Sequence, residues 1–141
     1  LYLDIDINLS NSRLIDTLFG NQKAVNNYIP LAPRLTSVGG LVAKFNNGLE
    51  FGLRYRYMKD RPANESNTIT AHGYNVVDFN ANYKTKHYKI GLVIENLLNN
   101  NWNEAQFDTE TRLRNETKSV NELHYTPGTP FYAKVVVGYL F

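Results

Sequence analysis

The sequence predicts an all-β protein, an antiparallel meander of about six strands that forms part of a membrane β-barrel. Apolar and polar residues alternate with a period of two in six separate segments. The more apolar phase of each segment contains no charged residue. The connections between the segments are alternately short and long, which is typical of outer-membrane barrels. These three observations together favour a barrel wall over a soluble sheet.

The first three segments span residues 1–9, 34–45 and 49–58. The first has an apolar residue at every odd position, and the second keeps the same phase. The third alternates most cleanly, because Leu49, Phe51, Leu53, Tyr55 and Tyr57 occupy its odd positions. Between the second and third segments lies only Asn-Asn-Gly, a favoured hairpin turn because Asn and Gly tolerate positive φ.

The last three segments span residues 74–84, 88–95 and 131–141, with a tight turn at 85–87. The final segment carries an uncharged phase that ends on Phe141. Its length suits a tilted strand that crosses a bilayer, for which about 9–11 residues suffice. A terminal aromatic residue on such a strand is expected where a barrel closes against its first strand, and it is hard to explain in a soluble domain.

All the charges of the six segments fall on the phase opposite to the apolar one. We expect this phase to face the barrel interior, although a solvated strand face would show the same pattern. These residues are Asp4, Asp6, Arg34, Lys44, Glu50, Arg54, Arg56, Asp78, Lys84, Lys89, Glu95 and Lys134.

The remaining connections are long, at residues 10–33, 59–73 and 96–130, and are predicted to be extracellular loops, with the short turns periplasmic. Mean hydropathy is −0.41, as expected where strands alternate. The net charge of +2 is too small to indicate a nucleic-acid partner. The chain has no cysteine, which excludes disulfide scaffolds.

Two other interpretations remain open. A soluble all-β ligand- or carbohydrate-binding module would also alternate, with one face on a core. It accommodates the long loops poorly, because connections beyond about 12–15 residues are uncommon in compact domains. A smaller complete barrel that acts as an outer-membrane enzyme would need a catalytic triad, and we identify no catalytic residues.

Several short motifs resemble those of TonB-dependent outer-membrane receptors. They occur in that family's order along the whole chain: a Pro-Arg at residues 33–34 before a strand, Gly-Tyr-Asn-Val-Val-Asp at 73–78, Ile-Glu-Asn-Leu-Leu-Asn at 94–99 and the closing Tyr-Leu-Phe at 139–141. Leu98 stands where the family usually has Phe.

The resemblance implies that residues 1–141 are the C-terminal part of a barrel of about 22 strands in the bacterial outer membrane, with the plug domain absent. It implies uptake of a scarce solute of the siderophore, cobalamin, metal chelate or glycan class, driven by a TonB-type energy-coupling complex through the plug. Tyr139 and Phe141 resemble the signal read by the barrel-assembly machinery. Besides membrane lipid, we expect the isolated fragment to associate with itself, with detergent or with another chain, since its edges are unpaired.

The loops supply the candidate ligand-binding residues, because aromatic, amide and charged side chains together suit a solute with hydrogen-bonding edges. Trp102 has an alternative role as an anchor at the membrane interface, and Arg61 and Glu65 have one as partners in loop salt bridges. We predict no metal and no cofactor, since the loop carboxylates lack the spacing of a calcium loop. The candidates are Arg61, Glu65, Trp102, Glu104, Gln106 and Arg112.

Overall fold

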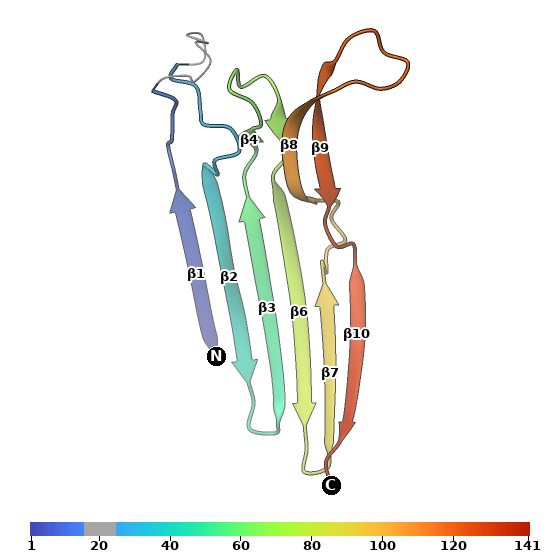
Figure 1. Ribbon diagram of the computed structural model, residues 1–141. Helices are drawn as coiled ribbons and strands as arrows, with labels where there is room; N and C mark the ends of the chain where they lie inside the picture. The colour runs from blue at the N-terminus through green and yellow to red at the C-terminus, as the bar shows by residue number, and fades with distance from the viewer. Residues whose placement is uncertain (16–24) are drawn as a thin grey trace.

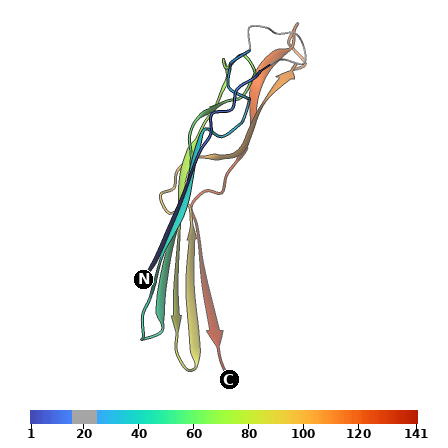
Figure 2. The ribbon, with the colours of Figure 1, turned by 90° about the vertical axis from the view of Figure 1, so that its left-hand side faces the viewer.

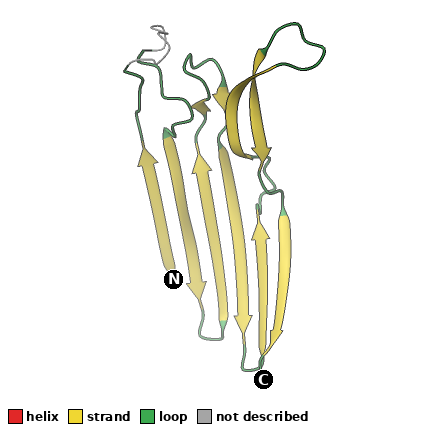
Figure 3. Ribbon diagram, in the orientation of Figure 1, coloured by secondary structure: helices red, strands yellow, loops and turns green. Residues whose placement is uncertain are grey.

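The computed structural model describes residues 1–15 and 25–141, and every regular element in this part of the chain is a strand (Figure 3). Six long strands form one antiparallel sheet in the order β1-β2-β3-β6-β7-β10 (Figure 1). Within the described residues, no helix is long and apolar enough to span a membrane. The six strands are β1 (Tyr2–Leu9), β2 (Leu35–Lys44), β3 (Leu49–Met58), β6 (Tyr74–Lys84), β7 (Tyr88–Glu95) and β10 (Tyr132–Tyr139).

The six strands coincide with the six predicted segments to within a residue or two at each end. Their sequence order is also their order across the sheet, so the predicted antiparallel meander is confirmed. The short turns at 46–48 and 85–87 lie at one end of the sheet and the long connections at the other (Figure 1). Gly48 has φ of 86°, which explains the Asn-Asn-Gly turn, because glycine reaches positive φ without strain.

The strand register confirms that the charges share one face. Residues directly opposite each other in an antiparallel pair point to the same side. Asp4 pairs with Gly40, Gly40 with Arg54, and Arg54 with Asp78, so one row of the sheet carries these side chains together. The neighbouring row pairs Leu41 with Leu53 and, across it, Phe79 with Ile94, and that row is uncharged.

No second layer of the described chain covers either face of the sheet. Seen from the side, the six strands form a single thin layer, and the upper loops lean away from it (Figure 2). The buried apolar core of the described residues is only Ala63, Ala71 and Val76. On the uncharged face, Ile5 is 59% exposed and Val137 is 69% exposed. Soluble proteins rarely expose an apolar surface of this extent to water. The core of a soluble sandwich lies between two sheets, so the structure does not support that alternative.

The long connections contain strands that the sequence did not predict. In the second, β4 (Arg61–Pro62) pairs with β5 (Thr70–Ala71), and in the third, β8 (Asn103–Thr111) pairs with β9 (Val120–Pro127). The β8–β9 hairpin rises from the loop end of the sheet beside β7 and β10 (Figure 1). Each face of the hairpin mixes polar and apolar residues, since Phe107 pairs with His124 on one face and Asp108 with Leu123 on the other, so neither face shows the uncharged phase of the six wall strands.

Candidate functional site

A recess of about 500 Å³ opens on the charged face of the sheet at its loop end. Strands β3, β6 and β7 supply its floor, and the residues that follow β7 supply its rim. The floor includes Arg54 and Arg56, and the rim includes Trp102 and Glu104. Charged residues from distant parts of the sequence therefore lie close together at the loop end of the sheet.

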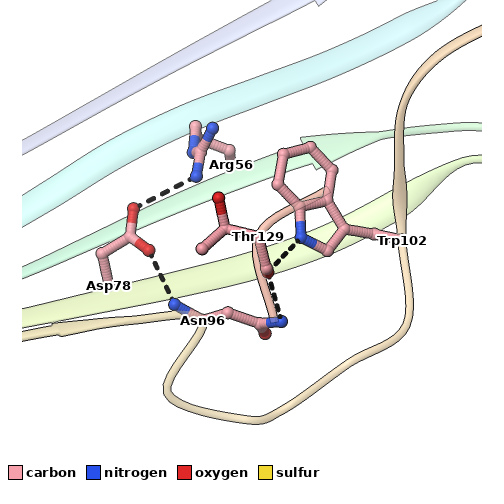
Figure 4. Close-up of polar contacts among 5 residues, drawn as sticks. All are labelled: Arg56, Asp78, Asn96, Trp102 and Thr129. Carbon is pink, nitrogen blue, oxygen red and sulfur yellow. Dashed lines mark hydrogen bonds and ion pairs between the residues drawn. The ribbon is translucent and has the colours of Figure 1, made fainter. Parts of the chain in front are cut away.

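Asp78 on β6 links two elements at the edge of this recess. Its Oδ2 lies 3.3 Å from Arg56 Nη2 on β3, and its Oδ1 accepts a hydrogen bond of 3.0 Å from the Asn96 backbone N–H (Figure 4). Arg56 and Asp78 are both partly shielded, with 34% and 26% of their side-chain surface exposed, so solvent screens this pair less than a surface salt bridge. The carboxylate fixes the position of the guanidinium and of the turn after β7.

Asn96 is the hub of that turn. Its side-chain Nδ2 donates to the backbone oxygens of Asn100, at 2.8 Å, and Thr129, at 3.1 Å, and its Oδ1 accepts from Asn100 N–H at 3.0 Å (Figure 4). The residue is 1% exposed and has φ of 51°, a region that Asn adopts more readily than most residues. One buried amide thus joins the end of β7 to the segment that leads into β10.

Trp102 is held rigidly over the recess. Its Nε1–H donates to the Thr129 backbone oxygen at 3.0 Å (Figure 4). Its ring lies 5.0 Å from the Tyr74 ring and 5.3 Å from the Arg56 guanidinium carbon. A Cβ at Gly128 would clash with the indole, so any larger residue there would displace the ring. Because Trp102 packs on the charged face, the structure contradicts the alternative of an anchor at the membrane interface.

The recess offers both signs of charge to a ligand. Arg54, Glu95 and Glu104 line it, and none of them forms an ion pair with another described residue. A second recess, of about 970 Å³, shares Trp102 and Glu104 and adds the rings of His72 and Tyr125. Trp102 and Glu104 therefore form a wall between two polar and aromatic recesses, an arrangement suited to a solute that presents a flat face and hydrogen-bonding groups.

The other predicted ligand residues lie away from this wall. Arg61, on β4, is 8% exposed, and its Nη1 has no hydrogen-bond partner among the described residues. Glu65 is half-buried, and its backbone oxygen accepts from Asn27 Nδ2 at 2.9 Å. In residues 1–15 and 25–141 the pair forms no loop salt bridge. Arg112 is exposed just beyond the end of β8.

Gln106, also predicted to contact ligand, holds two loops together. Its Oε1 accepts from His72 N–H at 2.9 Å, and its Nε2 donates to the His72 oxygen at 2.7 Å. Asn67 makes the same pair of bonds to Tyr28, at 2.9 and 3.1 Å. With both ends of its buried amide occupied, Gln106 positions the β8–β9 hairpin, and its contact with a ligand remains a prediction.

At the opposite end of the sheet, aromatic rings gather around the end of β10. The Tyr139 ring lies 5.3 Å from the Tyr88 ring and 5.2 Å from the Phe141 ring. Leu140 N–H donates to the His87 oxygen at 2.8 Å, which ties this segment to the short turn before β7. Such rings suit the boundary between lipid and water, where one end of an aromatic side chain is apolar and the other is wet.

Sequence reasoning missed Asn96 and Thr129 as parts of the site. Asn96 lies in the motif at 94–99, which pointed to a family but not to a role for the side chain. Thr129 contributes only its backbone oxygen, so its residue type carries no signal. The charged phase had already singled out Arg54, Arg56, Asp78 and Glu95. The strand register then places Arg54 directly opposite Asp78.

Comparison with known proteins agrees with this architecture. The model of the family described as TonB dependent receptor-like, beta-barrel matches residues 2–97. The chain belongs to this family. The structure is also similar to one described as the siderophore receptor PiuA from Acinetobacter baumannii, with a TM-score of 0.61 and 20% sequence identity. That likeness covers 81% of this chain and 14% of the receptor chain. No curated protein matches the sequence.

Family membership sets the surroundings of the sheet. The chain is β-barrel wall of the TonB-dependent receptor type and belongs in the bacterial outer membrane. The uncharged face is then the lipid-facing side, and the charged face with its recess is the interior. The chain spans about one seventh of the similar receptor's length, so it contributes only part of a complete wall.

Proposed function

We propose that this chain forms the C-terminal part, residues 1–141, of the barrel of a receptor that takes up a scarce solute of the siderophore, cobalamin, metal chelate or glycan class. The observation that carries the proposal is the wall made by Trp102 and Glu104 between two recesses at the loop end of the charged face. A fixed indole next to charged and amide groups binds solutes that combine a flat surface with hydrogen-bonding edges.

The joined loops support this role. Asn67 and Gln106 connect the three long connections into one unit through paired hydrogen bonds to neighbouring backbones. A binding site on such a unit loses less conformational entropy when the solute binds than a site on independent loops. The ordered rim therefore favours capture of a solute at low concentration.

The remaining partners follow from the same proposal. A complete barrel of about 22 strands encloses a plug, and the mixed charges of the inward face supply its contacts. A TonB-type energy-coupling complex acts through that plug, which lies outside this chain. Tyr139 and Phe141 then serve the barrel-assembly machinery. Alone, the six-stranded sheet leaves the outer edges of β1 and β10 unpaired, so we propose that it self-associates.

Solute binding provides the test. In the full-length receptor, we expect Trp102→Ala to weaken binding of the cognate solute by about tenfold or more, because aromatic contacts of this kind contribute about 1–3 kcal/mol. Glu104→Gln keeps the shape of an exposed side chain and removes only its charge. Binding is measured with purified receptor against ferric siderophores, cobalamin and oligosaccharides.

The matched control is Lys86→Ala, an exposed change in the short turn at the far end of the sheet. It leaves affinity and uptake unchanged if the loop end is the binding site. Equal affinity in the wild type, Trp102→Ala and Glu104→Gln would contradict the proposed site. A receptor that binds none of the solute classes would contradict the proposed function.

A further inference from the structure

Asp78 is connected to Trp102 by two separate routes, which together form a closed contact cycle of five residues (Figure 4). The first route starts at Asp78 Oδ1, which accepts a hydrogen bond from the Asn96 backbone N–H at 3.0 Å. Asn96 Nδ2 and Trp102 Nε1 then donate to the same Thr129 oxygen, at 3.1 and 3.0 Å. The second route starts at Asp78 Oδ2, which lies 3.3 Å from Arg56 Nη2. It ends where the Arg56 guanidinium carbon lies 5.3 Å from the centre of the Trp102 ring.

The two routes hold different parts of the indole. The first holds its edge, through the hydrogen bond from Trp102 Nε1 to the Thr129 oxygen. A hydrogen bond at one atom leaves the ring free to tilt about that atom. The second route restricts the tilt, because the Arg56 guanidinium lies over the ring itself. Only the two routes together give the indole a single orientation, and a binding group must be held to within about 10–20° to be effective.

The contact cycle is sheltered from solvent. Asn96 is 1% exposed, and the side chains of Arg56 and Asp78 are 34% and 26% exposed. The other ion pair of the charged face lies at the short-turn end, where Lys44 Nζ is 3.1 Å from Glu50 Oε2. Those two side chains are 72% and 37% exposed, so solvent screens that pair more strongly. Asp78 thus has a stronger hold on its partner than Glu50 has.

We propose that Asp78 and Arg56 are positioning residues for solute binding, which raise the affinity by orienting Trp102 rather than through contacts of their own. The inference rests on the proposed function, in which Trp102 contacts the solute. An indole that is already oriented loses less conformational entropy when a solute binds to it. The coupling is reciprocal, so a solute that holds the indole also strengthens the bond between Asp78 and the Asn96 N–H.

The experiment combines variants in the full-length receptor. The probe is whichever of the ferric siderophores, cobalamin and oligosaccharides the wild type binds most tightly. Asp78→Asn keeps an oxygen for the Asn96 N–H and removes the ion pair, and Arg56→Gln removes the same pair from the other side. Each change weakens binding by about fivefold, a usual size of coupling between residues of one network. Neither change weakens binding further when it is added to Trp102→Ala, because the indole that it orients is gone.

Hydrogen exchange of the Asn96 amide gives a second measurement, which a purely structural role would not affect. This N–H bonds to Asp78 Oδ1, so its exchange reports on the contact cycle. The bound probe slows the exchange by about fivefold in the wild type, because the coupling is reciprocal. In Trp102→Ala, saturating probe leaves the exchange rate unchanged.

The matched control is Glu50→Gln, which removes the Lys44 ion pair on the same face and keeps wild-type affinity. Arg56→Gln, at the more exposed end of its pair, carries the test if Asp78→Asn does not fold. Unchanged affinity in the folded variants would overturn the inference. So would a loss as large in the Trp102→Ala background as in the wild type, since it would show direct contact with the solute. If Trp102→Ala alone leaves the affinity unchanged, the proposed function fails and the inference fails with it.

Discussion

Phe79→Arg in the full-length receptor is expected to lower the free energy of unfolding in lipid by about 2–4 kcal/mol, the cost of a cation on the lipid-facing side near the bilayer midplane. Phe79 lies at the middle of β6 on the uncharged face, between Leu53 of β3 and Ile94 of β7. Its ring stacks on Phe51 at 6.2 Å, so the substitution also removes an aromatic contact.

Two controls separate these effects. Phe79→Leu removes the aromatic contact without adding charge, and Asn80→Arg adds the same cation one residue further along β6, on the charged face. We expect the free energy of unfolding of both variants to stay close to that of the wild type. Urea titration of the receptor folded into lipid vesicles measures this free energy for each variant. Equal losses for Phe79→Arg and Asn80→Arg would contradict the assignment of the two faces.

Asn96→Ala is expected to destabilise the junction between β7, β8 and β10 by about 3 kcal/mol. The change removes three side-chain hydrogen bonds of 2.8–3.1 Å, so the Asn100 N–H and oxygen lose their Asn96 partner, while the Thr129 oxygen keeps the bond from Trp102 Nε1. Each hydrogen bond of this kind contributes about 1 kcal/mol, and the losses are not additive. Alanine also tolerates the φ of 51° less well than Asn.

Asn96→Gly isolates the backbone contribution, because glycine accepts positive φ but restores none of the hydrogen bonds. We expect it to be less destabilised than Asn96→Ala and still far from the wild type. Asn101→Ala, at an exposed position in the same run, serves as the control. Hydrogen exchange of the Asn100 amide reports opening of the junction. Wild-type protection of this amide in Asn96→Ala would contradict the role of Asn96 as a hub.

The wall of the barrel could be predicted from sequence because the bilayer imposes a strong rule on it. Every second residue of a lipid-facing strand must be uncharged. The residue types of Leu53 and Arg54 alone therefore show that Leu53 lies on the uncharged face and Arg54 on the charged face. The β8–β9 hairpin follows no such rule. It is ordered by tertiary contacts, such as the Gln106 amide on the His72 backbone, and these have no local signature.

The site was predictable only in part, for a similar reason. The residue types of the 96–130 loop suggested Trp102 and Glu104 as ligand contacts, which stays a prediction, and the placement of these residues depends on partners far away in sequence. Trp102 is oriented by the Thr129 oxygen and Tyr74, which decides between a recess and the membrane interface. Arg61 had the residue type of a ligand contact but became a buried residue of β4. Sequence gives the chemistry of such side chains, and only the fold gives their surroundings.

Single-cysteine labelling on intact bacteria tests most directly whether this sheet is barrel wall with its long loops outside. The chain has no cysteine, so each introduced thiol reports one position. With a membrane-impermeant maleimide, we expect Ser119→Cys, between β8 and β9, to label on intact cells. Lys86→Cys, in the short turn, should label only after the outer membrane is permeabilised, and Leu53→Cys should resist labelling in both. Labelling of Leu53→Cys or Lys86→Cys on intact cells at the rate of Ser119→Cys would contradict the account.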